Sequence, residues 1–249
     1  MQAYITLTRR ELGTFFYSWI GYVVIAGAVF LTGLSFVILL RQLQAEPTPM
    51  PITEIFLSLC YWLIVLFSAP IITMRLFAQE KYSGTFETLM TTPVSDIAVV
   101  VAKFSAAIIF YMIMWLPLLI CILVLKYFSR GSNMLDPGTL GSTFLGIFLV
   151  GILYMSIGCF ASALTKNQIV AAMISFAIGL AFFFASYLNE PLAPQKSWEV
   201  EALNTVCILE QMKDFARGVV DTRYIAFYVT ACVFFLFLTY RVIESRRWK

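Results

Sequence analysis

The sequence contains no histidine among its 249 residues. This absence excludes Ser-His and Cys-His nucleophile pairs, histidine metal ligands and histidine haem ligation. The chain also has no G-x-x-x-x-G-K-[ST] phosphate-binding loop, so it cannot bind ATP through that motif. We therefore expect no catalytic, cofactor or metal site in this chain. If it moves a solute uphill, the energy must come from another polypeptide.

Charged residues are scarce, at 12% of the sequence, whereas 61% of the residues are hydrophobic. A soluble domain usually carries about 25% charged residues. The apolar residues form runs long enough to cross a bilayer as helices, and these runs are too continuous for barrel strands. Six runs qualify, at about 19–40, 55–74, 97–125, 140–164, 169–188 and 224–240. The prediction is a single all-α integral membrane domain over residues 1–249, in contact with the lipid bilayer and not with nucleic acid.

The predicted spans hold almost no ionisable side chains. Lys103 lies near the start of the third span, where we expect it to extend its amine to the membrane surface. A charge at mid-membrane is costly and usually marks an ion or proton path, so its absence disfavours a proton-coupled carrier. The hypothesis of a carrier that binds its solute or ion with backbone carbonyls alone remains open. The five cysteines show no C-x-x-C pair, and four of them lie in apolar runs, so we expect no disulfide.

The basic residues favour an orientation with both chain termini in the cytoplasm. Six spans place the two termini on one side of the membrane. In that orientation ten of the 17 basic residues lie inside, against five of the 14 acidic residues. Cytoplasmic segments of membrane proteins carry the excess of Lys and Arg. Residues 1–18, which carry Arg9 and Arg10 opposite an apolar face, are expected to form a helix in the cytoplasmic interface.

The connection between the second and third spans, residues 75–96, is longer than a simple turn requires. The second span can continue as a helix towards Glu80, and Ser83 and Gly84 then break it. A short helix follows, with an apolar stripe and an acidic residue in its first turn, near the positive end of the helix dipole. The stripe is Phe86, Leu89 and Met90, and the acidic residue is Glu87.

A two-turn helix is marginal in water, so its apolar stripe must be buried against something. Two interpretations follow from the residues alone. The helix folds back onto its own spans or the membrane interface, or it inserts into a groove on a cytoplasmic partner protein.

The run E-K-Y-S-G-T-F-E-T-L-M-T-T-P-V-S, residues 80–95, follows M-R-L-F-A-Q and resembles the signature loop of type-2 ABC (ABC-2) transporter permeases. In that family the loop carries the coupling helix, which docks on an ATPase subunit. The resemblance implies that the partner-coupling residues are Glu80, Lys81, Ser83, Gly84, Thr85, Phe86, Glu87, Leu89 and Met90. The ending F-L-F-L-T-Y-R-V-I-E-S-R-R-W, residues 235–248, resembles more narrowly the permeases of gliding motility and nitrous oxide reductase maturation.

This resemblance implies a permease subunit, not an enzyme, of a bacterial ABC exporter in the inner membrane. The permease would work by alternating access. It would pair with a second permease, with the first and fifth spans near the seam, and with two ATPase subunits that bind ATP and Mg²⁺. The resemblance leaves open whether an accessory protein binds on the periplasmic side, and it does not indicate which substrate is transported. The rival hypotheses are an ATPase-independent secondary carrier, a membrane scaffold that transports nothing, and, less favoured, a membrane enzyme.

Two further patterns carry structural expectations. Small residues at four-residue spacing, such as Gly158 and Ser162, allow helices to approach closely within the chain. The outside segment 189–223 contains a helical stripe and the pair Glu210 and Lys213, and Gly218 ends the helix. The stripe is Ile208, Met212, Phe215 and Val219. Either this helix seals the outer mouth of the bundle, which we favour, or it forms an exit gate or a dock for an outer partner.

Overall fold

The computed structural model describes residues 2–45, 59–86, 95–128, 137–186 and 207–247. Within them the chain forms helices and no strand, which confirms the predicted all-α class. The helices are α1 (Gln2–Phe16), α2 (Trp19–Ala45), α4 (Leu59–Thr73), α5 (Ala78–Ser83), α7 (Asp96–Met114), α8 (Leu116–Phe128), α9 (Pro137–Leu164), α10 (Gln168–Ala185), α12 (Ile208–Ala216) and α13 (Thr222–Arg247).

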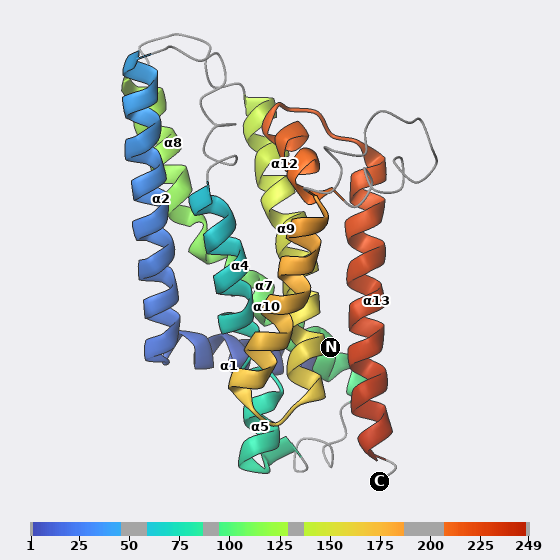
Figure 1. Ribbon diagram of the computed structural model, residues 1–249. Helices are drawn as coiled ribbons and strands as arrows, with labels where there is room; N and C mark the ends of the chain where they lie inside the picture. The colour runs from blue at the N-terminus through green and yellow to red at the C-terminus, as the bar shows by residue number, and fades with distance from the viewer. Residues whose placement is uncertain (1, 46–58, 87–94, 129–136, 187–206, 248–249) are drawn as a thin grey trace.

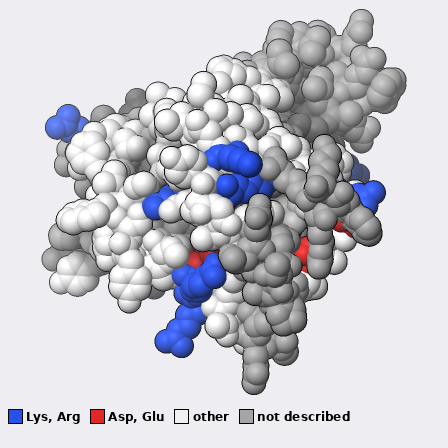
Figure 2. Space-filling model, turned by 90° about the horizontal axis from the view of Figure 1, so that it is seen from below, with Lys and Arg blue, Asp and Glu red and all other residues white. Residues whose placement is uncertain are grey.

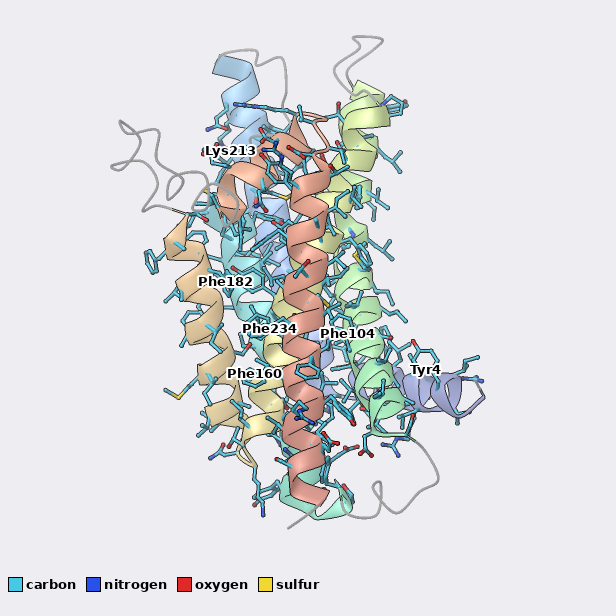
Figure 3. All side chains as sticks on the ribbon, turned by 90° about the vertical axis from the view of Figure 1, so that its right-hand side faces the viewer. Tyr4, Phe104, Phe160, Phe182, Lys213 and Phe234 are labelled. Atoms are coloured by element: carbon cyan, nitrogen blue, oxygen red, sulfur yellow. The ribbon has the colours of Figure 1, made fainter. Side chains whose placement is uncertain are left out.

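Six helical stretches among these residues are long and apolar enough to cross a membrane, as predicted. They are Trp19–Gln42, Leu59–Ser83, Asp96–Val124, Pro137–Leu164, Gln168–Ala185 and Thr222–Ser245. The spans stand side by side, while α1 lies across one end of the bundle and α5 lies at the same end, where both termini also lie (Figure 1). We call this the α5 end. The opposite, α12 end carries Lys213, far from Tyr4 of α1 (Figure 3).

Helix α9 is the centre of the bundle. In the 18-residue apolar stretch of its span 72% of the residues are buried, against 22% in the corresponding stretches of α2, α10 and α13. Glycines on α9 let large neighbours approach: a Cβ atom at Gly151 would lie 2.3 Å from the ring of Tyr111, and one at Gly158 only 2.0 Å from Thr73 Oγ1. The small residues therefore serve packing within the chain, as the spacing of Gly158 and Ser162 predicts.

The sequence predicted that the second span continues as a helix towards Glu80, but in the structure the helix is interrupted. Helix α4 ends at Thr73, and α5 begins only at Ala78. The reason is Ser162 of α9, whose hydroxyl oxygen accepts hydrogen bonds from the backbone N–H groups of Phe77 (3.0 Å) and Ala78 (3.1 Å). In a continuing helix those two groups would donate to carbonyls four residues earlier. The hydroxyl of Ser162 thus takes the place of the two backbone carbonyls that would accept these hydrogen bonds in a continuous helix.

Helix α12 closes the other end of the bundle. Its predicted apolar residues Ile208, Met212 and Phe215 are buried, and Lys213 pairs with Glu210 at 2.7 Å. Gly218 adopts a φ of +90°, so the helix ends before it, as predicted. Val219 follows that turn and is 54% exposed, so its assignment to the buried stripe was wrong. The burial of α12 against α9 favours a seal for this end of the bundle.

Candidate functional site

The short helix α5 ends where the sequence predicted a break. Gly84 follows Ser83 with a φ of +75°, a left-handed backbone conformation that glycine adopts at little cost. Helical backbone resumes at Thr85 and Phe86. The rest of the predicted coupling segment, including Glu87, Leu89 and Met90, lies outside the described residues.

The segment from α5 to Phe86 has one exposed and one buried side. Tyr82 is 81% exposed, and Ser83, Gly84 and Thr85 beside it are also exposed. On the other side Lys81 and Phe86 are buried within the same chain, and the Lys81 amine lies 5.3 Å from the centre of the Phe86 ring. For Phe86 the structure therefore favours burial against the chain's own helices over insertion into a partner.

Four charged side chains from three elements meet behind α5. Lys103 of α7 contacts Glu11 of α1 at 3.0 Å and Glu80 of α5 at 2.9 Å. Arg10 of α1 contacts the same two carboxylate oxygens at 3.0 Å and 3.1 Å. Each cation contacts both carboxylates. Two positive and two negative charges make the set neutral as a whole. We call these four residues the charge cluster.

The expectation that Lys103 extends to the membrane surface was wrong. Its side chain is 1% exposed, because the two carboxylates and the ring of Phe77, 5.5 Å from its amine, enclose it. Glu11 is 8% exposed, whereas Arg10, on the outside of the cluster, is 55% exposed. Burying a charge is tolerated only when partners satisfy it. The cluster supplies those partners and thereby fixes α5 to α1 and α7.

A second set of contacts fixes α5 to α9. The hydroxyl of Ser162 accepts hydrogen bonds from the backbone N–H groups of Phe77 and Ala78, and it donates one to the carbonyl of Met74 at 3.2 Å. Lys81 donates to the carbonyl of Ala163, at the end of α9. A displacement of α5 would consequently act on α1, α7 and α9 together.

A cleft of about 580 Å³ opens beside the charge cluster. It is lined by Arg10, Glu11, Thr14, Phe15, Arg75, Leu76, Gln79, Glu80, Ser83, Thr85 and Lys103. Basic side chains gather on this face of the molecule, which Figure 2 shows from below. The cleft therefore brings charged side chains of α1, α5 and α7 next to Ser83 and Thr85, on the exposed side of the segment from α5 to Phe86.

Sequence reasoning placed Glu80, Lys81 and Gly84 in the site but missed several residues that hold it. Glu11 interrupts the apolar face expected for residues 1–18. This acidic residue on an apolar face was the one sequence signal that a basic residue is buried beside it. Tyr82 lies inside the predicted coupling run yet was not singled out. Nothing in the sequence indicated that Ser162 contacts the backbone of the α4–α5 connection.

The described residues contain no group of three or more Cys, Asp or Glu side chains placed to hold a metal ion. The five cysteines are free thiols in the structure.

Comparison with protein families gives one finding that bears on this site. The family model described as "ABC-2 family transporter protein" matches residues 41–199, more than half of the chain. The matched stretch runs from the end of α2 past the end of α10 and includes α5 and Lys103. It leaves out α1, which supplies the other half of the charge cluster. The search of curated proteins found no match.

Proposed function

The chain belongs to the ABC-2 family of transporter proteins and is a multi-pass membrane subunit of the permease kind. From this premise we propose that it forms the membrane part of a bacterial ABC exporter. A partner ATPase would bind ATP and Mg²⁺ and dock on the segment from Glu80 to Met90. The observation that carries the proposal is the position of α5, which is exposed on one side and fixed to three other helices on the other.

In this proposal the ATPase pushes on the exposed side of α5, around Tyr82. Glu80 passes the displacement through the charge cluster to α1 and α7, and Lys81 passes it to α9. Because α9 is the most buried span, tilting it changes the packing of the whole bundle. Such a coupled tilt is the movement that alternating access requires.

The proposal places the α5 end in the cytoplasm and the α12 end outside the inner membrane. It is supported by the excess of basic residues on the segments of the α5 end, together with the position of both termini there (Figure 1). The complex would contain two permeases and two ATPases. The spans of α2 and α10, which are only 22% buried, are proposed to face the second permease.

Labelling of single cysteines tests the orientation. Tyr82→Cys and Val219→Cys both stand at exposed positions, at opposite ends of the bundle. We expect an impermeant maleimide added to intact cells to label position 219 and not position 82, and to label both after the membrane is opened. The native protein, whose cysteines are buried or half-buried, is the control. The reverse pattern would overturn the orientation.

Co-purification tests the proposed function itself. We expect the tagged chain to co-elute with an ATPase subunit in equal amount, since the permease has no phosphate-binding loop of its own. The purified complex should lose transport when ATP is replaced by a non-hydrolysable analogue. Transport by the chain alone in proteoliposomes, driven by an ion gradient, would instead establish a secondary carrier.

A further inference from the structure

The cleft beside the charge cluster has its charges sorted by depth. The side chains of Glu11, Glu80 and Lys103 are largely buried, whereas that of Arg10 is 55% exposed. Arg75, which also lines the cleft, is half-buried. Both carboxylates therefore lie inside, and a guanidinium lies at the outside. A group that enters the cleft from solvent meets positive charge first.

Arg10 has the donors to bind a further anion. A guanidinium carries five N–H donors, and Arg10 contacts both Glu11 and Glu80 through a single nitrogen, Nη2. Lys103 contacts the same two carboxylates from the buried side. An incoming carboxylate can consequently pair with Arg10 while α1 and α5 stay joined.

A second exposed cation lies where α5 meets two other helices. Helix α5 contacts α9 and α10, and Lys166 is an exposed residue of the turn that joins them. This turn lies at the same end of the bundle as α5 (Figure 1). Exposed positive charge is therefore present near α5 at its contact with α1 and at its contact with the α9–α10 turn.

The charge balance of the whole α5 end points the same way. Its segments carry ten basic and five acidic residues, and Glu87 is one of the five. Membrane topology explains such an excess in general, because cytoplasmic segments are rich in Lys and Arg. It does not explain why the carboxylates of the cleft are buried while Arg10 is exposed. That arrangement offers a positive surface beside Tyr82.

We propose that the ATPase subunit docks on the α5 end through an acidic surface, with one carboxylate that enters the cleft and pairs with Arg10. This inference rests on the proposed function and adds the chemistry of the partner's surface. Because Arg10 also contacts Glu11 and Glu80, the pair joins the ATPase directly to the charge cluster. The contact at Tyr82 is then one of two routes by which force reaches α1 and α7.

The rival occupant of the cleft is an anionic lipid, since basic residues next to a membrane attract such lipids. Position favours the ATPase. Helix α5 lies beyond α1 at this end of the bundle (Figure 1). Ser83 and Thr85, which are exposed residues of the segment that projects there, line the cleft.

The association rate of the ATPase with the permease tests the surface. The permease is placed in nanodiscs of phosphatidylcholine, so that the lipid carries no net charge. We expect the rate constant to fall by about tenfold between about 0.05 and 0.5 M salt, because salt screens the attraction between charged surfaces. At about 0.15 M salt Arg10→Gln should weaken subunit affinity about tenfold, between the effects of an exposed and a buried ion pair.

Arg10→Gln also removes a contact of Glu80, so a loosened α5 would weaken assembly by itself. A purely structural loss leaves the salt dependence of the association rate unchanged, whereas loss of an attracting charge lowers it. Lys166→Gln, in an exposed turn outside the charge cluster, should slow association about threefold with no change in thermal stability. Arg241→Gln is the matched control, since Arg241 is 61% exposed but lies on α13 and does not line the cleft.

ATPase binding that is insensitive to salt and to both Arg10→Gln and Lys166→Gln would overturn this inference and leave the proposed function intact. Absence of any ATPase binding would instead overturn the proposed function, and the inference with it. Vesicles of phosphatidylglycerol provide the third arm. If Arg10→Gln abolishes binding of the purified permease to this lipid but leaves ATPase affinity unchanged, the cleft belongs to the membrane lipid and the acidic docking surface is refuted.

Discussion

Lys103→Met is expected to lower the free energy of unfolding by about 3–5 kcal/mol, the cost of removing one partner from a buried ion pair. The substitution keeps most of the length of the side chain but leaves Arg10 as the one cation that contacts Glu11 and Glu80 among the described residues. Glu11 is 8% exposed, so water from the adjoining cleft replaces the lost amine only in part. Reversible unfolding in mixed detergent micelles measures the change.

Lys213→Met is the matched control at the α12 end. Lys213 is 29% exposed and pairs with Glu210, which is 56% exposed. Exposed pairs contribute about 0–1 kcal/mol, so this variant should be close to the native protein. Adding Glu80→Gln to Lys103→Met restores neutrality and should recover about 0.5–3 kcal/mol. Equal effects of the two lysine substitutions would show that the charge cluster does not hold the α5 end together.

Tyr82→Ala is expected to weaken assembly with the partner ATPase by more than about tenfold, because an aromatic anchor at the centre of an interface contributes about 2 kcal/mol or more. Since Tyr82 is 81% exposed in the chain alone, the stability of the isolated permease should not change. Subunit affinity, measured with the permease in nanodiscs, gives the first effect, and thermal unfolding gives the second.

Tyr127→Ala provides the control, since Tyr127 is also 81% exposed but lies at the far end of α8. Phe86→Ala should act differently from Tyr82→Ala. Phe86 is buried against Lys81, so its loss should destabilise the α5 end first and weaken assembly as a consequence. If Tyr82→Ala assembles like the native protein while Phe86→Ala does not, partner contact at the exposed side of α5 is refuted.

The size of the Glu87→Ala effect on the same affinity separates two roles for this residue. Loss of an interaction with the helix dipole costs about 0.3–1 kcal/mol. Loss of a buried charge pair with the partner costs about 2–5 kcal/mol.

The features that the sequence predicted are those that depend on neighbours along the chain. The six spans follow from long apolar runs, and the break after Ser83 follows from the backbone freedom of Gly84. The buried stripe of α12 follows from helical spacing up to Phe215 and fails at Val219, where Gly218 has already ended the helix.

The contacts that the sequence did not predict join distant residues. Lys103 and Glu11 are 92 positions apart, and no local pattern distinguishes a lysine that is buried and paired from one that reaches the membrane surface. Ser162 interrupts the second span from 85 positions away, through its contact with Phe77. The sequence likewise did not show which surface buries Phe86. An apolar stripe indicates that it must be covered, but it does not indicate whether its own chain or a partner covers it.

Photo-cross-linking from position 82 tests the central claim, that the exposed side of α5 receives the ATPase. A photoreactive amino acid replaces Tyr82, the permease is expressed together with its partner ATPase, and the cross-linked products are identified by mass spectrometry. The account predicts a permease–ATPase product from position 82 and none from position 127. Products that contain only lipid or a second permease, in a complex that still hydrolyses ATP, would contradict it.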